Sequence, residues 1–173
     1  RRYPLGSKDP VLEEKSLELM KKCIELAQDL GVRTIQLAGY DVYYEEKSPQ
    51  TRQRFIKNLR KACDWAEEAQ VVLAIEIMDD PFINSIEKYL AIEKEIDSPF
   101  LFVYPDIGNV SAWHNDIYSE FYLGHHAIAA LHLKDTYAVT ESSKGQFRDV
   151  PFGQGCVKWE EAFDILKETN YNG

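Results

Sequence analysis

The sequence predicts an α/β protein with a parallel sheet, and three observations carry this prediction. Helix and strand patterns alternate along the 173 residues in the order α-β-α-β-α-β-α-β-α. The strands begin near residues 34, 71, 100 and 130, and a spacing of about 30 residues is typical of βα units. The runs 71–77 and 100–104 are apolar on both faces, as strands are when helices cover both sides of a parallel sheet.

The first half of the chain predicts two long helices around one short strand. Asp9-Pro10 begins a helix over residues 9–30, because Asp caps free backbone amides and proline fits the first turn. A strand over 32–38 and a tyrosine-rich loop over 40–47 follow. Ser48-Pro49 begins the second helix. The side chains on the inner face of this helix are Phe55, Ile56, Leu59, Ala62, Cys63 and Ala66.

The second half continues the alternation with shorter elements. A capping box at Asn84-Ser85 begins a helix to about Glu95, and Ser98-Pro99 ends it. The stretch 147–155 reads as a long loop that contains two glycines. The remaining elements expected in this half are strands over 71–77, 100–104 and 129–133 and helices over 117–126 and 159–169.

These units predict one domain over residues 1–173, formed by the central part of a (β/α)₈ barrel. Such a barrel typically needs about 250 residues, and the four βα units account for roughly half of it. The chain starts at Arg1 without an initiator methionine or a signal-peptide pattern, and ends where another strand is expected. We therefore expect a partial barrel that lacks the first strands and the last strand. A complete, small doubly wound fold is the alternative.

The composition narrows the classes of function. Twenty-nine acidic and 20 basic residues give a net charge of −9, which repels a nucleic-acid backbone unless the bases gather into a patch. The longest apolar run, 71–75, is far shorter than the roughly 18 residues of a membrane span. Three widely spaced cysteines without a CxxC pair indicate neither a disulfide framework nor a thiolate zinc site. We expect a cytoplasmic protein with neither nucleic-acid nor membrane partners.

Three potential metal ligands stand at the carboxyl ends of consecutive predicted strands: Glu76, Asp106 and His132. Ligands bind at these strand ends in parallel α/β folds, and two carboxylates with one imidazole suit Mn²⁺, Mg²⁺, Zn²⁺ or Co²⁺. Singly, Glu76 could pair with a cation such as Lys134, Asp106 could cap a turn, and His132 could bond a carbonyl. Burying all three together is costly without a cation, so we predict a metal site that one further ligand would complete.

Other polar groups are expected near the same end of the sheet. The side chains of Gln36, Asn109 and Lys134 fall there, and the amides of Gly153 and Gly155 could approach an anion. We predict these five residues as substrate-binding. The Gly-x-Gly spacing alone is a weak signal, because most such loops are simply turns.

Four motifs stand out along the chain: Ala-Ile-Glu-Ile-Met-Asp (74–79), Tyr-Pro-Asp-Ile-Gly-Asn (104–109), Leu-His-Leu-Lys-Asp-Thr (131–136) and Val-Pro-Phe-Gly-Gln-Gly (150–155). As a set they resemble the L-ribulose-5-phosphate 3-epimerase family, also called L-xylulose-5-phosphate 3-epimerase, of the xylose-isomerase-like barrels. The segments 1–7 and 37–41 are similar to the same family, so the resemblance extends along essentially the whole chain.

The resemblance implies a metal-dependent epimerase that inverts C3 of a ketopentose 5-phosphate. It implies a divalent metal held by Glu76, Asp106, His132 and a second glutamate beyond Gly173, with the metal on the C2 carbonyl and C3 hydroxyl oxygens. Glu76 would be one of two acid/base groups that move the C3 proton through an enediolate. Because the second glutamate is absent, we expect this chain to have a weakened metal site and little or no epimerase activity.

Related epimerases that act on free ketoses carry His three residues after the aspartate ligand and Arg six after the histidine ligand. Asn109 and Ala138 stand at those positions here, which is compatible with a phosphorylated substrate. Three alternatives are an isomerase on the same barrel, a metal-dependent endonuclease acting on damaged DNA, and a non-catalytic truncated domain. The negative charge and the small number of histidines disfavour the nuclease. Unpaired strand edges of a partial barrel favour a homo-oligomer, such as a dimer.

Overall fold

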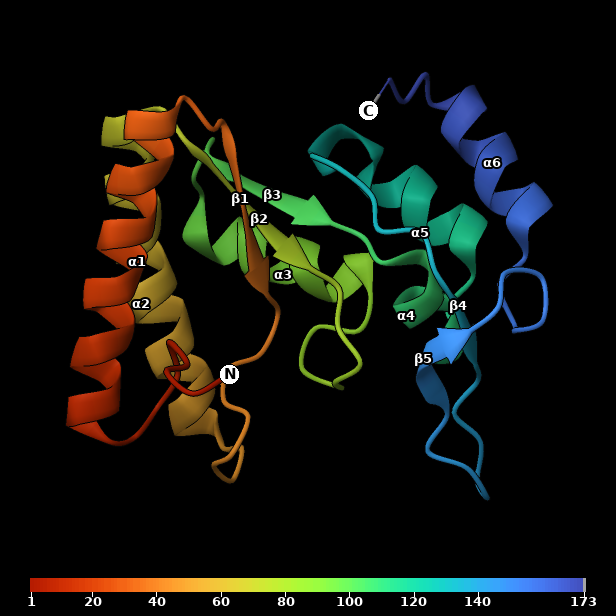
Figure 1. Ribbon diagram of the computed structural model, residues 1–173, viewed down its shortest axis with the longest axis horizontal. Helices are drawn as coiled ribbons and strands as arrows, with labels where there is room; N and C mark the ends of the chain where they lie inside the picture. Colours follow the sequence, from red (N-terminus) through yellow and green to blue (C-terminus); the bar gives the residue numbers. More distant parts are fainter. Residues whose placement is uncertain (173) are drawn as a thin grey trace.

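The computed structural model describes residues 1–172, in which helices and strands alternate through the first two thirds of the chain (Figure 1). The first six elements are α1 (Pro10–Leu30), β1 (Thr34–Ala38), α2 (Pro49–Ala69), β2 (Val72–Glu76), α3 (Ile86–Ile96) and β3 (Leu101–Tyr104). The other six are α4 (Ile107–Ala112), α5 (Ile117–Gly124), the 3₁₀ turn η1 (His125–Ala127), β4 (Asp135–Tyr137), β5 (Gln146–Val150) and α6 (Trp159–Glu168).

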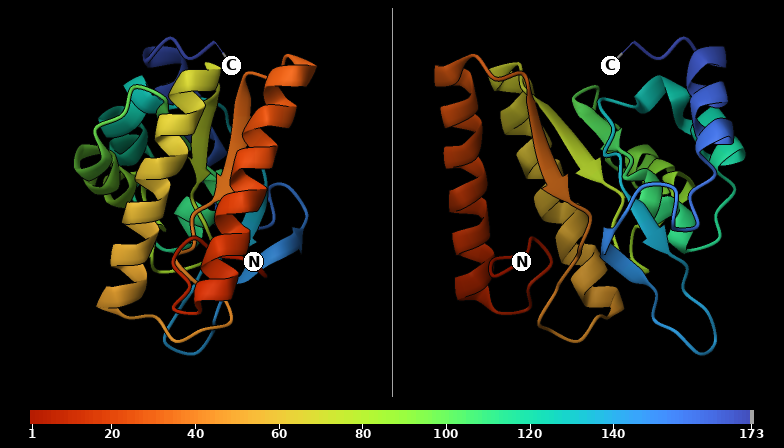
Figure 2. Two further views of the ribbon diagram at one scale, coloured as in Figure 1. Left: turned by 90° about the vertical axis from the view of Figure 1, so that its left-hand side faces the viewer. Right: turned by 45° about the vertical axis from the view of Figure 1, so that its right-hand side comes forward.

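The central sheet is parallel, as predicted, in the order β1-β2-β3. Its register pairs Ala38 with Glu76 and Glu76 with Tyr104, so the three strands end side by side. The helices α1 and α2 lie next to each other on one side of this sheet, as both views in Figure 2 show. All three carboxyl ends therefore meet at one edge of the sheet, where the predicted ligands follow.

The long helices begin where their capping residues predict. The Asp9 side chain accepts a hydrogen bond from the Val11 amide, and Ser48 forms a capping box with Thr51. All six side chains of the predicted inner face of α2 are buried, and Leu59, Ala62 and Ala66 are completely inaccessible. They belong to one hydrophobic core that includes Leu73 and Ile75 of β2. Burial of this continuous apolar face is what holds α2 against the sheet.

The strand predicted over residues 129–133 is wrong as a continuous strand. The segment does run parallel to β3, but only through two isolated bridges, Val103 with Ile128 and Asp106 with His132. The register slips by one residue between these bridges. Pro105 lies between them, and because it has no amide hydrogen it cannot donate to the neighbouring segment. The backbone still joins the sheet, since the amides of Ala129 and His132 donate to the carbonyls of Val103 and Pro105.

The loop predicted over residues 147–155 is partly wrong, because its first residues belong to a strand. β5 pairs antiparallel with β4, and this hairpin lies on the opposite side of the molecule from α1 and α2 (Figure 1). The short helix α4 is also absent from the sequence prediction, although Asp106 caps it. Within residues 1–172, no helix is both long and apolar enough to cross a membrane.

Candidate metal and substrate site

The structure brings the three predicted ligands together. Glu76 is the last residue of β2, Asp106 follows β3 and caps α4, and His132 lies in the extended segment beside β3. One ligand atom from each residue lies within 4.8 Å of the other two. His132 Nδ1 is 3.0 Å from Asp106 Oδ2 and 3.3 Å from Glu76 Oε1. The three side chains therefore converge at the carboxyl edge of the sheet.

Backbone hydrogen bonds fix this convergence. The His132 amide donates to the Pro105 carbonyl, and the Ile107 amide donates to the His132 carbonyl, so His132 is tied to both neighbours of Asp106. Asp106 Oδ1 accepts from the Asn109 amide at 2.9 Å, as the capping residue of α4. The parallel register of β2 and β3 sets Glu76 beside this turn. Each ligand is placed by main-chain structure rather than by a flexible loop.

The Asp106 carboxylate has capacity for a cation. Its side chain is completely buried, and Oδ2 has no hydrogen-bond partner of good geometry, although His132 Nδ1 and Lys134 Nζ both lie 3.0 Å from it. Burial raises the pKa of Asp106, while Lys134 and the Asn109 amide oppose this effect. Two carboxylates and an imidazole with one buried oxygen unsatisfied are a suitable donor set for a divalent cation. The residues present therefore fit a metal.

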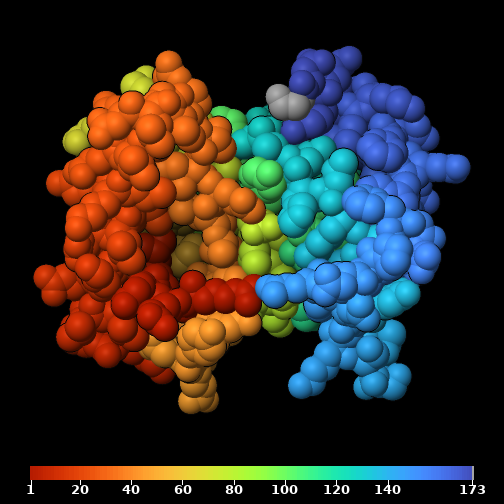
Figure 3. All heavy atoms as spheres, viewed as in Figure 1, coloured from red at the N-terminus to blue at the C-terminus, as the bar shows by residue number. Residues whose placement is uncertain are grey.

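A cavity of about 390 Å³ opens beside these ligands. Figure 3 shows this side of the molecule, where the red N-terminal segment reaches across to the blue residues of the hairpin. Two strand-end loops, the N-terminal residue and β5 all contribute to the lining. Besides the three ligands, the lining residues are Arg1, Met78, Asp79, Asn109, Lys134, Phe147, Arg148 and Asp149.

The five predicted substrate-binding residues divide into two groups. Asn109 and Lys134 line the cavity, and Asn109 is oriented by a hydrogen bond from Nδ2 to the Ile77 carbonyl at 2.8 Å. Gln36 lies on β1 opposite Ala74, outside the lining. The amides of Gly153 and Gly155 also lie outside it and donate to the carboxylate of Asp135. A substrate role for Gln36 and the two glycines therefore stays a prediction from the sequence alone.

Arg1, Phe147, Arg148 and Asp149 are among the lining residues that the sequence does not predict as site residues. Three of them lie on β5, which the sequence prediction placed in a loop. A signal for this hairpin exists, because Ser142, Ser143 and Gly145 stand directly before the segment Gln-Phe-Arg-Asp-Val. Turn residues of this kind between two short strands are typical of a hairpin.

The fold and this arrangement of ligands define an α/β barrel protein with a polar site at the strand ends. Residues 1–173 match the family model described as the xylose isomerase-like TIM barrel, and the chain belongs to this family. The prediction of a partial barrel of this type is thereby confirmed, and the small doubly wound fold is wrong.

Comparison with curated sequences shows which proteins of this family the chain resembles. The chain is 56% identical to the "Putative L-ribulose-5-phosphate 3-epimerase SgbU" of Haemophilus influenzae, and 48% identical to the "L-ribulose-5-phosphate 3-epimerase UlaE" of Escherichia coli O157:H7. Both matches include all of this chain, and they cover 60% and 59% of those relatives. The chain thus spans about three fifths of the length of the curated relatives it matches.

Solved structures support the same fold. An L-ribulose 3-epimerase structure superposes with a TM-score of 0.81 at 20% identity, over 98% of this chain and 56% of that one. A D-allulose 3-epimerase from Methylomonas sp., solved in complex with D-allulose, gives 0.80 at 18% identity over 99% and 58%. At these identities the likeness is one of fold.

Proposed function

We propose that the protein carrying this chain is a metal-dependent sugar-phosphate epimerase that inverts C3 of L-ribulose 5-phosphate or L-xylulose 5-phosphate. The observation that carries the proposal is the convergence of Glu76, Asp106 and His132 beside a cavity at the strand ends. The names of the relatives that are 48% to 56% identical support the same reaction. The substrate partner is a small sugar phosphate.

Glu76, Asp106 and His132 would hold the divalent cation, which is Zn²⁺, Mn²⁺, Mg²⁺ or Co²⁺. When bound, such a cation stabilises negative charge that develops on substrate oxygens during deprotonation. Asp106 is fully buried, so bulk water does not reach its carboxylate. His132 is the most exposed of the three residues, with 48% of its side chain accessible.

Glu76 is the proposed acid/base residue. Its carboxylate lines the cavity and is 14% exposed, so it can reach a bound substrate while it is shielded from bulk water. As a carboxylate it accepts the C3 proton of the ketose. Inversion requires a second proton-transferring group on the opposite face, which we assign to the part of the barrel that this chain does not span. We therefore expect the 173-residue chain by itself to show little or no epimerisation.

The charge of the cavity supports a phosphorylated substrate. Arg1, Lys134 and Arg148 bring three cations to a lining that also contains carboxylates. The guanidinium of Arg1 donates to the hydroxyls of Tyr43 at 3.0 Å and Tyr40 at 3.3 Å, and it lies over both rings. Cations in an otherwise acidic cavity compensate the charge of a phosphate ester.

The proposal is tested by incubating the full-length protein with L-ribulose 5-phosphate and Mn²⁺ in D₂O. We expect deuterium at C3 and formation of L-xylulose 5-phosphate. Glu76→Gln should lower the rate about 10²- to 10⁴-fold, the usual contribution of a general acid/base. Glu67→Gln, on the exposed side of α2, is the matched control and should retain the rate. An aldose product without exchange at C3 would contradict epimerisation and favour an isomerase.

A further inference from the structure

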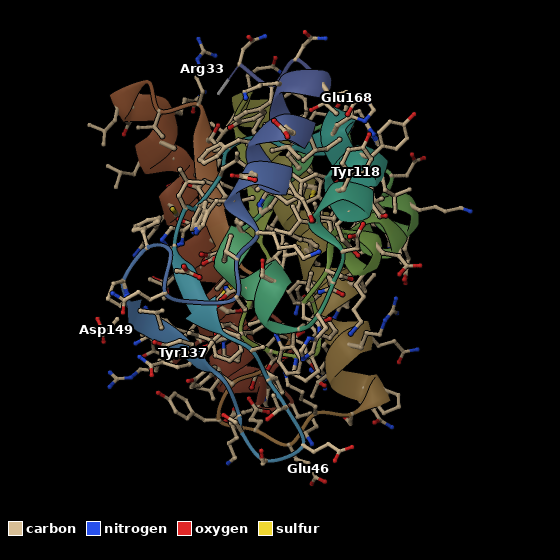
Figure 4. The ribbon with its side chains drawn as sticks, turned by 90° about the vertical axis from the view of Figure 1, so that its right-hand side faces the viewer. Arg33, Glu46, Tyr118, Tyr137, Asp149 and Glu168 are labelled. Atoms are coloured by element: carbon tan, nitrogen blue, oxygen red, sulfur yellow. The ribbon has the colours of Figure 1, made fainter. Side chains whose placement is uncertain are left out.

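The hairpin formed by β4 and β5 is irregular at the position where it meets the cavity. Asp135 pairs with Val150 and Tyr137 with Gln146, so one residue of β4, Thr136, lies opposite three residues of β5. Figure 4 labels Tyr137 and Asp149 on the two strands of this hairpin. The three residues of β5 that form this bulge, between the paired residues Gln146 and Val150, are Phe147, Arg148 and Asp149.

Asp149 adopts a left-handed backbone conformation with φ of 57°. Residues other than Gly, Asn and Asp rarely adopt this conformation, because their Cβ atom then crowds the following carbonyl oxygen. Strand bulges and such backbone outliers occur preferentially next to functional sites, where they redirect side chains. Here the bulge has this consequence, because all three bulged residues line the cavity beside the metal ligands.

Arg148 differs from the other two cations of the cavity. Lys134 is engaged by Asp106, and Arg1 is engaged by Tyr40 and Tyr43. The guanidinium of Arg148 makes no ion pair and no hydrogen bond with any residue in the described range 1–172. Its backbone carbonyl alone accepts a hydrogen bond, from Gln146 Nε2. An unengaged guanidinium offers paired N–H donors that match the oxygens of a phosphate.

We propose that Arg148 determines the specificity for a phosphorylated substrate by binding the phosphate group with its guanidinium. The bulge of β5, with its left-handed residue Asp149, is the structural device that directs Arg148 toward the cavity. This inference rests on the proposed epimerase function, because it assigns the charged end of that substrate. Arg148 then compensates for the acidic groups that surround the ligand site, including Asp79.

The test compares L-ribulose 5-phosphate with L-ribulose as substrates of the full-length enzyme. Arg148→Gln should lower kcat/KM for the phosphate ester about 10- to 100-fold, chiefly through KM, the loss expected for one charge-assisted contact. It should leave kcat/KM for L-ribulose nearly unchanged. Arg148→Lys should retain part of the preference. Lys144→Gln, at the exposed tip of the hairpin, is the matched control and should leave both values unchanged.

The bulge is tested separately by two substitutions of its left-handed residue. Asp149→Gly permits the same backbone conformation and should keep the preference for the phosphate ester. Asp149→Val resists a positive φ, so it should reduce the preference as Arg148→Gln does. Circular dichroism and a thermal unfolding curve establish that both variants are folded.

Titration of the metal-free protein with inorganic phosphate gives a readout that needs no turnover. Arg148→Gln should weaken this binding about 10- to 100-fold, and Lys144→Gln should not change it. An equal loss of activity on both substrates, or unchanged phosphate binding, would overturn the role of Arg148. If the wild-type enzyme epimerises neither ketose but binds phosphate through Arg148, the proposed function fails while the phosphate site stands.

Discussion

Asp106, which caps α4, and Asp135, which begins β4, are both buried, but their carboxylates differ in how many hydrogen bonds they accept. Asp135 accepts hydrogen bonds from the amides of Gly153 and Gly155 and from further donors, so both of its oxygens are satisfied. Burial alone would raise the pKa of Asp135, but these backbone hydrogen bonds outweigh it and lower the pKa. Asp106 instead retains one oxygen without a well-aligned donor, and its pKa is raised by burial. Asp135 is therefore structural, and Asp106 is suited to a cation.

Replacing Asp106 should remove metal affinity. Asp106→Asn keeps the shape of the side chain and the cap on α4 but removes the charge, so we expect Mn²⁺ affinity of the full-length apoprotein to fall at least about 100-fold. Asp116→Asn is a matched control, because Asp116 caps α5 in the same way and lies outside the cavity lining. Isothermal titration calorimetry with Mn²⁺ measures the affinity of both variants. Equal affinity in the two variants would show that Asp106 is not a ligand.

Replacing Asp135 should destabilise the protein instead. Asp135→Asn replaces one accepting carboxylate oxygen by an NH₂ group, which cannot accept hydrogen bonds from the backbone N–H groups around it. We therefore expect the free energy of unfolding to fall by about 2–3 kcal/mol at pH 7. Because the folded pKa is lowered, this contribution is present above the unfolded value near 3.8 and is lost as the pH falls through the folded pKa. The difference from wild type in urea unfolding should shrink below pH 4. Asp164→Asn, on the exposed side of α6, should cause little change at either pH.

At the scale of elements, Glu13 joins α1 to α2. Its carboxylate accepts from Asn58 Nδ2 at 2.9 Å and from Arg54 at 2.6 Å, and the Asn58 hydrogen bond, with the charges of Arg54 and Lys57, lowers the pKa of Glu13. Glu13→Gln should reduce the free energy of unfolding by about 1 kcal/mol at pH 7. The effect should disappear as the pH falls from 4.5 through the lower folded pKa.

Chemical unfolding of the full-length protein at pH 7 and pH 3 measures this effect. Glu18→Gln is the control, because Glu18 lies on the same helix but pairs only with exposed lysines of that helix. It should change stability less than Glu13→Gln at pH 7. A larger effect of Glu18→Gln would mean that the contact between α1 and α2 is not what stabilises these helices.

The elements that could be predicted are those with local signals. Caps at Asp9, Ser48 and Ser85 mark helix starts, and the doubly apolar runs mark β2 and β3. The segment 129–133 has the composition of a strand but is interrupted, because its pairing depends on Pro105 in a neighbouring strand end, which no local pattern reports. The sequence does not predict the hairpin, because its bulge breaks the alternation of apolar and polar residues that identifies a strand.

The candidate site was predictable to the same extent. Glu76 ends one regular strand, and Asp106 and Asn109 lie in the turn and the short helix that follow the next strand, so topology alone brings them together. Arg148 comes from an antiparallel hairpin outside the central sheet, and its place in the cavity depends on a backbone outlier at Asp149. The position of Arg148 is set by tertiary structure, and the repeating βα pattern of the sequence does not predict it.

At the scale of the whole molecule, the arrangement leaves one strand edge open. Within residues 1–172, β1 pairs with β2 alone, so the other edge of Thr34–Ala38 has no partner strand. Thr34, Gln36 and Ala38 are exposed on β1, and Val32 before it is 44% exposed. An unpaired edge of this kind is a template for pairing with a second chain.

We therefore expect the 173-residue chain, prepared alone, to form a dimer or a larger assembly at micromolar concentration. Light scattering after size-exclusion chromatography measures its mass. The double variant Thr34→Lys with Gln36→Lys places charges on the exposed face of β1, which opposes edge pairing, so its mass should fall toward the monomer of 20.0 kDa. Arg33→Lys preserves the charge beside the strand and should leave the assembly unchanged. A monomeric wild-type chain, or assembly unaffected by the two lysines, would show that the edge of β1 does not bring the chains together.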